Sequence, residues 1–230
     1  MALPKIDVPT FEIAILGTDN KITCRPFLVK ESNILTLAIA AEDQKEMLRA
    51  CKQVIKNCSY DEIDVDSLAM YQLQDIFLKL KIKSVGELQS FELACGSCGD
   101  KIQYDMNLGD FKVVGDITSL TKKIKFSEST GMVLKYPSAE LTIEMADLSD
   151  VEVLVNCIDY IYDSEEITRP DADNAVEIVE YVDTIPLGPY EEAEQFFSTI
   201  PTLAHNIEFK CRGCETNNQI VVNGIEHFFA

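Results

Sequence analysis

The sequence predicts an α+β fold: an N-terminal β-hairpin and long helices, then two cysteine hairpins separated by an inserted acidic, partly helical lobe. Two observations lead to this fold class. The hydrophobic pattern changes from alternation to helical spacing along the chain, without repeating a strand–helix–strand unit. Two Cys-x-x-Cys sequences with matched surroundings also lie far apart. We therefore expect a body of residues 1–109 and 206–230, with residues 110–205 inserted into it as a lobe.

The N-terminal third predicts a hairpin followed by helices. Apolar and polar residues alternate in Phe11-Glu-Ile-Ala-Ile-Leu16 and in 21–29, and the turn residues Gly17-Thr-Asp-Asn20 join them, which is typical of a β-hairpin. From Glu31 to about Asn57 apolar residues recur near helical spacing, so one long helix is expected. The segment Asp64-Val-Asp-Ser-Leu68 is a helix-start signal, and an apolar face continues from it to about Lys83.

The two Cys-x-x-Cys sequences predict a single metal site. In each copy an apolar–acidic–apolar run leads into the cysteines, and a polar turn and a second short strand follow, at 101–106 and 219–222. This is the hairpin knuckle from which zinc ribbons are built. Two knuckles supply four thiolates, the number that tetrahedral Zn²⁺ takes at about 2.3 Å. The predicted ligands are Cys95, Cys98, Cys211 and Cys214. Since 112 residues separate the two pairs, this split zinc ribbon closes only through tertiary folding.

The cysteines have three other interpretations. A redox dithiol usually lies where a strand meets a helix, and neither pair does. Cysteines that only fill a core do not suit turns as polar as Gly96-Ser97 and Arg212-Gly213. Iron in place of zinc stays open, because ligand type alone does not identify the metal. A closed four-thiolate shell has no position for water or substrate, so we expect a structural metal and no enzyme.

The region between the cysteine pairs predicts a mixture of strands and helices. Short strands are expected near 112–115 and 132–137. A helix is expected from Asp147 to about Tyr162, and another contains Tyr190 to Phe197. Ile200-Pro201 ends the latter helix and leads into the second cysteine hairpin.

Charge and composition exclude several classes of function. The net charge is −19. Between Ala139 and Thr199 the sequence has seventeen acidic residues and one basic residue, Arg169. Only Lys101, Lys210 and Arg212 lie near the cysteine hairpins, too few for a nucleic-acid surface. No signal peptide or membrane span is expected, which indicates a reducing cytoplasm. The acidic segment is expected to be solvated or to steer docking onto a basic partner.

Two parts of the chain resemble a known family. Asn20-Lys-Ile-Thr-Cys-Arg-Pro-Phe-Leu-Val-Lys-Glu-Ser-Asn-Ile-Leu-Thr-Leu-Ala38 is similar to the opening of the baseplate hub proteins of T-even-like tailed bacteriophages. The segments 194–203 and 224–229, on either side of the second cysteine hairpin, resemble the C-terminal part of that family. One departure is Glu215, which stands where the first copy has Gly99.

The resemblance implies a structural or assembly component of the central hub of a contractile tail. It implies no enzymatic activity and no small-molecule substrate. Its partners would be other phage tail and hub proteins, and its location the host cytoplasm during assembly and then the baseplate. A tail-assembly chaperone that leaves before the virion matures is an alternative, and a zinc-ribbon regulator that binds nucleic acid or the transcription machinery is a more distant one.

Four residues are candidates for contacts with partner proteins. Arg25 and Phe27 lie in the resembling segment, where Arg25 could instead pair with Glu31 and Phe27 could pack inside the fold. Phe228 and Phe229 lie at the C-terminal end, where the two aromatic rings would either pack on the protein's own zinc ribbon or insert into a neighbouring subunit.

Overall fold

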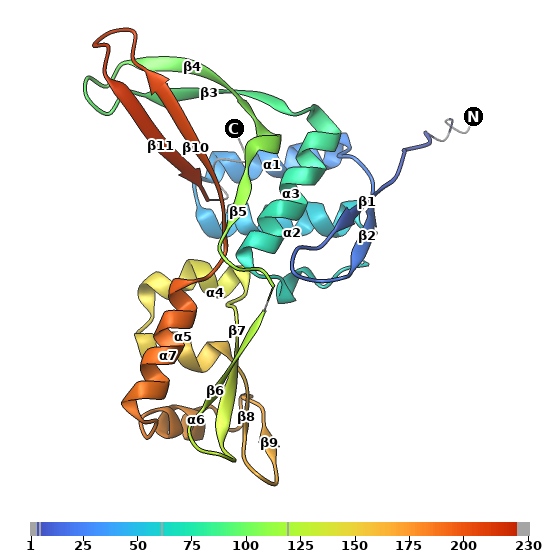
Figure 1. Cartoon of the computed structure of the whole chain (residues 1–230). Coiled ribbons are helices and arrows are strands. Elements are labelled where there is room, and N and C mark those ends of the chain that lie inside the picture. The colour runs from blue at the N-terminus through green and yellow to red at the C-terminus, as the bar shows by residue number, and fades with distance from the viewer. Residues whose placement is uncertain (1–3, 5, 61, 119, 225–230) are drawn as a thin grey trace. The chain divides into compact units, whose positions relative to one another are not determined.

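The computed structural model describes residues 4, 6–60, 62–118 and 120–224. The chain divides into two compact units, Met1–Val114 with Thr202–Ala230 and Gly115–Pro201 (Figure 1). Both contain helices and antiparallel sheet, which confirms the α+β class. The inserted lobe with the bounds 110–205 remains a prediction.

The first unit begins with the predicted hairpin. Strands β1 (Phe11–Ala14) and β2 (Lys21–Cys24) are antiparallel. Their inward-facing isoleucines, Ile13 and Ile22, lie directly opposite each other and are buried. The alternation in the sequence therefore marks the face that packs into the core.

The single helix predicted from Glu31 to about Asn57 is wrong, because the structure has two helices there. α1 (Val29–Ala41) ends at Glu42, which adopts the left-handed conformation with φ 51°. α2 (Gln44–Cys58) then starts at the N-cap Asp43, whose carboxylate accepts the backbone N–H groups of Lys45 and Glu46. Asp43 thus accepts N–H groups in the first turn of α2 that have no partner within the helix, and this fixes the point where the two helices are separated.

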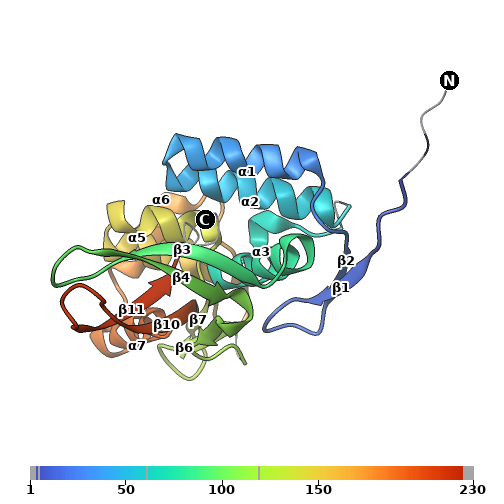
Figure 2. The ribbon, with the colours of Figure 1, turned by 90° about the horizontal axis from the view of Figure 1, so that it is seen from above.

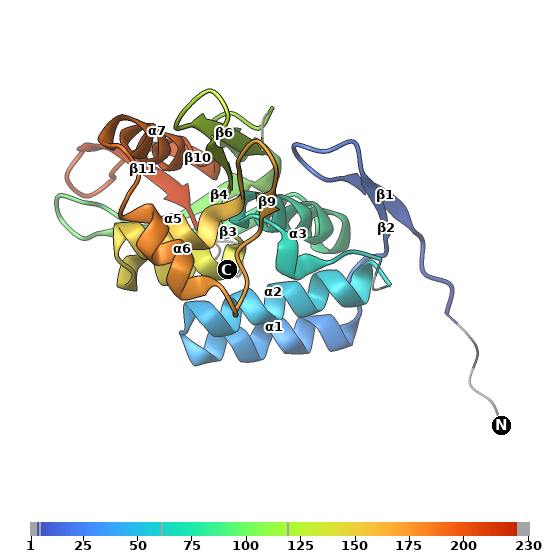
Figure 3. The ribbon, with the colours of Figure 1, turned by 90° about the horizontal axis from the view of Figure 1, so that it is seen from below.

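The next helix is confirmed, but it starts later than predicted. Asp64 caps the short 3₁₀ turn η1 (Val65–Ser67), and α3 (Met70–Val85) follows it. The apolar face of α3 is fully buried, and α2 contributes buried residues such as Val54 and Ile55 to the core of this unit. Figures 2 and 3 show α1 and α2 side by side.

Both cysteine hairpins form as predicted, with longer strands. The first consists of β3 (Leu88–Ala94) and β4 (Lys101–Asn107), and the second of β10 (Thr202–Lys210) and β11 (Asn217–Asn223). After the 3₁₀ turn η2 (Leu108–Asp110), the predicted strand β5 (Lys112–Val114) pairs with β10 and gives the sheet order β11-β10-β5. In that pairing Val114, the last residue before the second unit, lies opposite Thr202, the first residue after it.

The second unit contains the four-stranded antiparallel sheet β6-β7-β8-β9. Its strands are β6 (Thr121–Lys125), β7 (Gly131–Lys135), β8 (Ile158–Tyr162) and β9 (Ile167–Thr168). The helix predicted to run to Tyr162 is wrong beyond Cys157, where α5 (Asp150–Cys157) ends. The aromatic and β-branched residues of β8 pair with the central strand β7 instead.

Four further elements complete the second unit. They are α4 (Ala139–Glu144), the 3₁₀ turn η3 (Met145–Asp147), α6 (Ala175–Val182) and α7 (Leu187–Ser198). The predicted helix at Tyr190 to Phe197 is confirmed as part of α7. Phe196 of this helix stacks on Tyr136, with ring centroids 4.6 Å apart. Among the described residues, no helix is both long and apolar enough to cross a membrane.

Gly131, at the start of β7, has no room for a side chain. A Cβ atom there would meet the carbonyl oxygen of Ile124 on β6 and the hydroxyl of Tyr162 on β8. We expect Gly131→Ala to lower the free energy of unfolding by about 1–3 kcal/mol, the usual cost of overpacking. Gly188 of α7 has open space around it, so Gly188→Ala is the control. Denaturant unfolding of both variants checks this, and equal stabilities would contradict it.

Candidate metal centre

The turn of the first cysteine hairpin is held by its own backbone. The N–H of Cys95 donates to the carbonyl of Asp100 at 2.8 Å, and the N–H of Gly99 donates to the carbonyl of Cys95 at 2.9 Å. These bonds tighten the chain between Cys95 and Cys98, so that both sulfurs lie on one side of the turn.

The second turn repeats this arrangement residue for residue. The N–H of Cys211 donates to the carbonyl of Thr216 at 2.9 Å, and the N–H of Glu215 donates to the carbonyl of Cys211 at 3.1 Å. The matched sequence patterns therefore fold into matched turns, although they lie in separate sheets.

Tertiary folding brings the two turns together. All four Sγ atoms lie within 4.8 Å of one another. Cys95 Sγ lies 3.6 Å from Cys214 Sγ, and Cys98 Sγ lies 3.7 Å from Cys211 Sγ. Four sulfurs at about 2.3 Å from a tetrahedral ion are about 3.8 Å apart. These separations are far too long for disulfide bonds, and all four cysteines are free. The residues therefore fit a four-thiolate metal ion.

Backbone N–H donors lie close to two of the four sulfurs. The N–H of Ser97 lies 3.4 Å from Cys95 Sγ, and the N–H of Gly213 lies 3.4 Å from Cys211 Sγ. The backbone N–H groups of Cys98 and Ser97 lower the pKa of the Cys95 thiol to about 6. Thiolate is the form that binds metal, so the backbone favours it at Cys95. At Cys98 the backbone N–H of Asp100 acts to lower the pKa of the thiol, but the neighbouring cysteines and burial raise it to about 12.

Asn218 on β11 contacts the cysteine cluster, and the sequence analysis did not identify it. Its side-chain Nδ2 donates to Cys95 Sγ at 3.4 Å, and its Oδ1 accepts the N–H of Gly96 at 3.0 Å. It thus bridges the two hairpins and orients a sulfur, as outer-shell partners of metal ligands do. The only signal in the sequence is an amide residue four positions after Cys214.

Glu215 has the conformation of a glycine. Its φ is 59°, and the equivalent Gly99 has φ 72°. A non-glycine residue in this region costs about 1–2 kcal/mol, and the ion pair of Glu215 with Lys210 is exposed and offsets little. We expect Glu215→Gly to raise the free energy of unfolding by about 1 kcal/mol. Gly99→Ala should lower it, and thermal unfolding of both variants provides the check.

The predicted partner residues have different surroundings. The side chain of Arg25 is buried, and it pairs with Glu31 through two bonds of 3.1 Å. Phe27 is half-buried, with its ring centroid 5.8 Å from that of Phe77. This geometry supports a role in folding for both residues, and their contact with a partner remains a prediction. Phe228 and Phe229 lie outside the described residues.

The fold and the cysteine cluster define an α+β protein in which four cysteines from two distant hairpins converge. The family model described as "T4 bacteriophage base plate protein" matches residues 8–230. The chain therefore belongs to the T4 bacteriophage base plate protein family. No curated protein and no solved structure matches it.

Family membership supports a structural or assembly role in a phage baseplate. The predicted resemblance to T-even-like phage proteins is confirmed at the level of the baseplate family. It also supports a location in the tail baseplate and contacts with other structural proteins of the phage.

Proposed function

We propose that this chain is a non-enzymatic component of the baseplate hub, acting through protein–protein contacts and held rigid by one structural Zn²⁺ ion. The baseplate part of the proposal rests on the family match over residues 8–230. The hub part rests on the resemblance of segments 20–38 and 194–229. The absence of nucleic-acid binding follows from the few basic residues near the cysteine hairpins.

The metal part rests on four sulfurs within 4.8 Å of one another. Cys95, Cys98, Cys211 and Cys214 would fill a tetrahedral shell, which suits zinc and leaves no position for a substrate. Iron accepts the same ligands, so the metal has to be identified by measurement. The ion would supply only structural cross-linking.

The position of this cross-link gives it a mechanical use. The chain leaves the first unit after Val114 and returns at Thr202, and these two residues pair at one end of the β5–β10 ladder. The metal would fix the far end of β10, next to Cys211. Closing a loop of this length contributes about 4–5 kcal/mol through the unfolded state in a chain-entropy model. Both ends of the inserted segment are thereby held in a fixed relation, as an assembly part requires.

Mass spectrometry of purified phage particles and of assembly intermediates tests the hub role. We expect the chain in baseplate intermediates and in mature virions. Presence in intermediates alone would favour the chaperone alternative, and absence from both would overturn the proposal. Native mass spectrometry and elemental analysis of the purified chain should find one zinc ion per chain. A folded chain without metal would overturn the metal part.

A further inference from the structure

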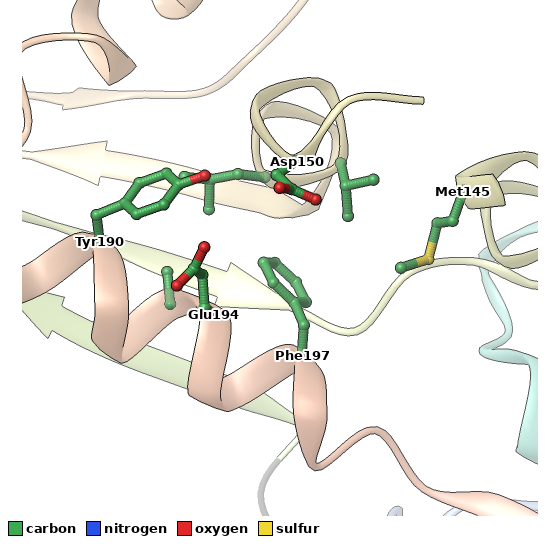
Figure 4. Close-up of a pocket in the computed structure, with 8 residues that line it drawn as sticks. Met145, Asp150, Tyr190, Glu194 and Phe197 are labelled. Carbon is green, nitrogen blue, oxygen red and sulfur yellow. The ribbon is translucent and has the colours of Figure 1, made fainter. Parts of the chain in front are cut away.

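The second unit contains a cavity of about 300 Å³ between α5 and α7 (Figure 4). Its floor is apolar, because Val153, Leu154 and Ala193 line it and are buried. Tyr190, Glu194 and Phe197 of α7 lie at helical spacing on one face and rise toward Asp150 of α5, as Figure 4 shows. The volume is at the low end for ligand pockets, and it suits a single long side chain.

Two carboxylates stand at the rim of this cavity. Asp150 and Glu194 are exposed, and within the part of the chain that the structure describes neither has an ion-pair partner. Burial raises the pKa of Tyr190, and the charges of Glu194 and Asp150 raise it further. The rim therefore carries two carboxylates without a cationic partner above an apolar floor.

We propose that this cavity binds an arginine side chain presented by a partner protein. The methylene stem of arginine would cover the apolar floor, and its guanidinium would reach the carboxylates. A guanidinium has five donors in a planar fork, so it can serve two carboxylates, and it stacks on rings such as those of Tyr190 and Phe197. A purely apolar side chain would leave the carboxylates desolvated and without a cation.

The arginine is assigned to another protein because this chain contains few arginines. Arg25 is buried, and Arg49 and Arg169 pair with Glu46 and Asp159. The remaining one, Arg212, lies in the turn of the candidate metal centre. The acidic segment around the cavity, with seventeen acidic residues between Ala139 and Thr199, would also repel a second copy and attract a basic partner.

The proposal shares with the proposed function only the assumption that the chain acts through protein contacts. Its test uses the purified full chain, so the result does not depend on a bound metal or on incorporation into particles. Three peptides serve as probes: Gly-Ser-Arg-Ser-Gly, and the same peptide with citrulline or norleucine in the centre. Citrulline keeps the shape of arginine without its charge, and norleucine keeps only an apolar stem.

We expect the arginine peptide to shift the amide NMR signals of Tyr190, Glu194 and Phe197, and to bind at least about tenfold more tightly than either analogue. Asp150→Asn and Glu194→Gln should each weaken it roughly threefold or more. Glu191→Gln is the matched control, since Glu191 is an exposed carboxylate of α7 that does not line the cavity. Thermal unfolding of each variant verifies its fold.

Several outcomes would overturn the assignment. Equal weakening by Glu191→Gln would reduce the effect to general attraction by negative charge. Equal or tighter binding of norleucine would make the cavity an apolar docking site. If the arginine peptide at millimolar concentration shifts none of these three amide NMR signals, the cavity does not bind arginine. Self-association of the chain that Glu194→Gln abolishes would assign the cavity to a second copy.

Discussion

Cys211→Ser should abolish the proposed zinc binding and unfold the two cysteine hairpins. The four sulfurs come from two separate sheets, so no backbone ladder replaces the ion if it is lost. Structural zinc contributes on the order of 10–16 kcal/mol to the folding of small zinc-finger peptides. We expect less than one tenth of the zinc content of the native chain, together with loss of amide protection in β10 and β11.

A substitution in the same region provides the control for this experiment. Ser97 lies between two of the proposed ligands and contacts Cys95 Sγ through its backbone N–H, so Ser97→Ala should keep the proposed zinc binding. Cys51→Ala removes a thiol that is buried away from the cluster. It should leave the zinc content unchanged, although it leaves a small cavity. Elemental analysis measures the zinc content, and hydrogen exchange measures the amide protection of β10 and β11. A Cys211→Ser chain that stays fully zinc-loaded would refute the ligand assignment.

The cysteine cluster could be anticipated from sequence because its signal is local and repeated. Each Cys-x-x-Cys lies in its own hairpin, and equal surroundings indicated one shared site even though 112 residues intervene. The contribution of Asn218 was not predictable in the same way. Its bonds to Cys95 and Gly96 exist only after the two hairpins meet, and the sequence does not encode that contact as a pattern.

The errors in the fold have specific physical reasons. At Asp43 an N-cap interrupts an apolar pattern that continues on both sides, and periodicity alone does not register such a break. At Ile158–Tyr162 the apolar run suits a helix and a strand equally, and pairing with β7 decides between them. That pairing is tertiary, because β7 and β8 are separated by α4 and α5. The cavity between α5 and α7 likewise depends on how two helices pack.

Glu31→Leu should lower the free energy of unfolding by about 3–5 kcal/mol, the usual cost of removing one partner of a buried ion pair. Glu31 is fully buried and accepts two 3.1 Å bonds from Arg25, whose own side chain is 7% exposed. Without Glu31 the guanidinium keeps hydrogen bonds to the carbonyls of Pro26 and Asn57 and to the Sγ atom of Cys58, and none of these neutralises its charge. Denaturant unfolding measures the loss, and a cost near zero would contradict the pairing.

The double variant Arg25→Leu/Glu31→Leu separates the pair itself from the penalty of an orphaned charge. We expect the double variant to be more stable than Glu31→Leu, because no charge remains buried. The double variant should still be less stable than the native chain, since Glu31 also accepts the N–H of Leu28 at 2.9 Å at the start of α1. Lys30→Ala is the control, because its contact with Glu31 is 3.6 Å long and its side chain is 62% exposed.

The Arg25–Glu31 pair also predicts how the stability of the protein changes as the pH falls. Burial acts to raise the pKa of Glu31, but hydrogen bonds from Arg25 and from the backbone of Leu28 hold it below its usual range. A carboxyl with a lowered folded-state pKa stabilises the protein above its unfolded-state pKa, and that contribution is lost as the pH falls through the folded-state pKa. The Arg25→Leu/Glu31→Leu chain should therefore lose less stability on acidification than the native chain. If both lose equal amounts of stability, protonation of Glu31 does not contribute to the loss at low pH.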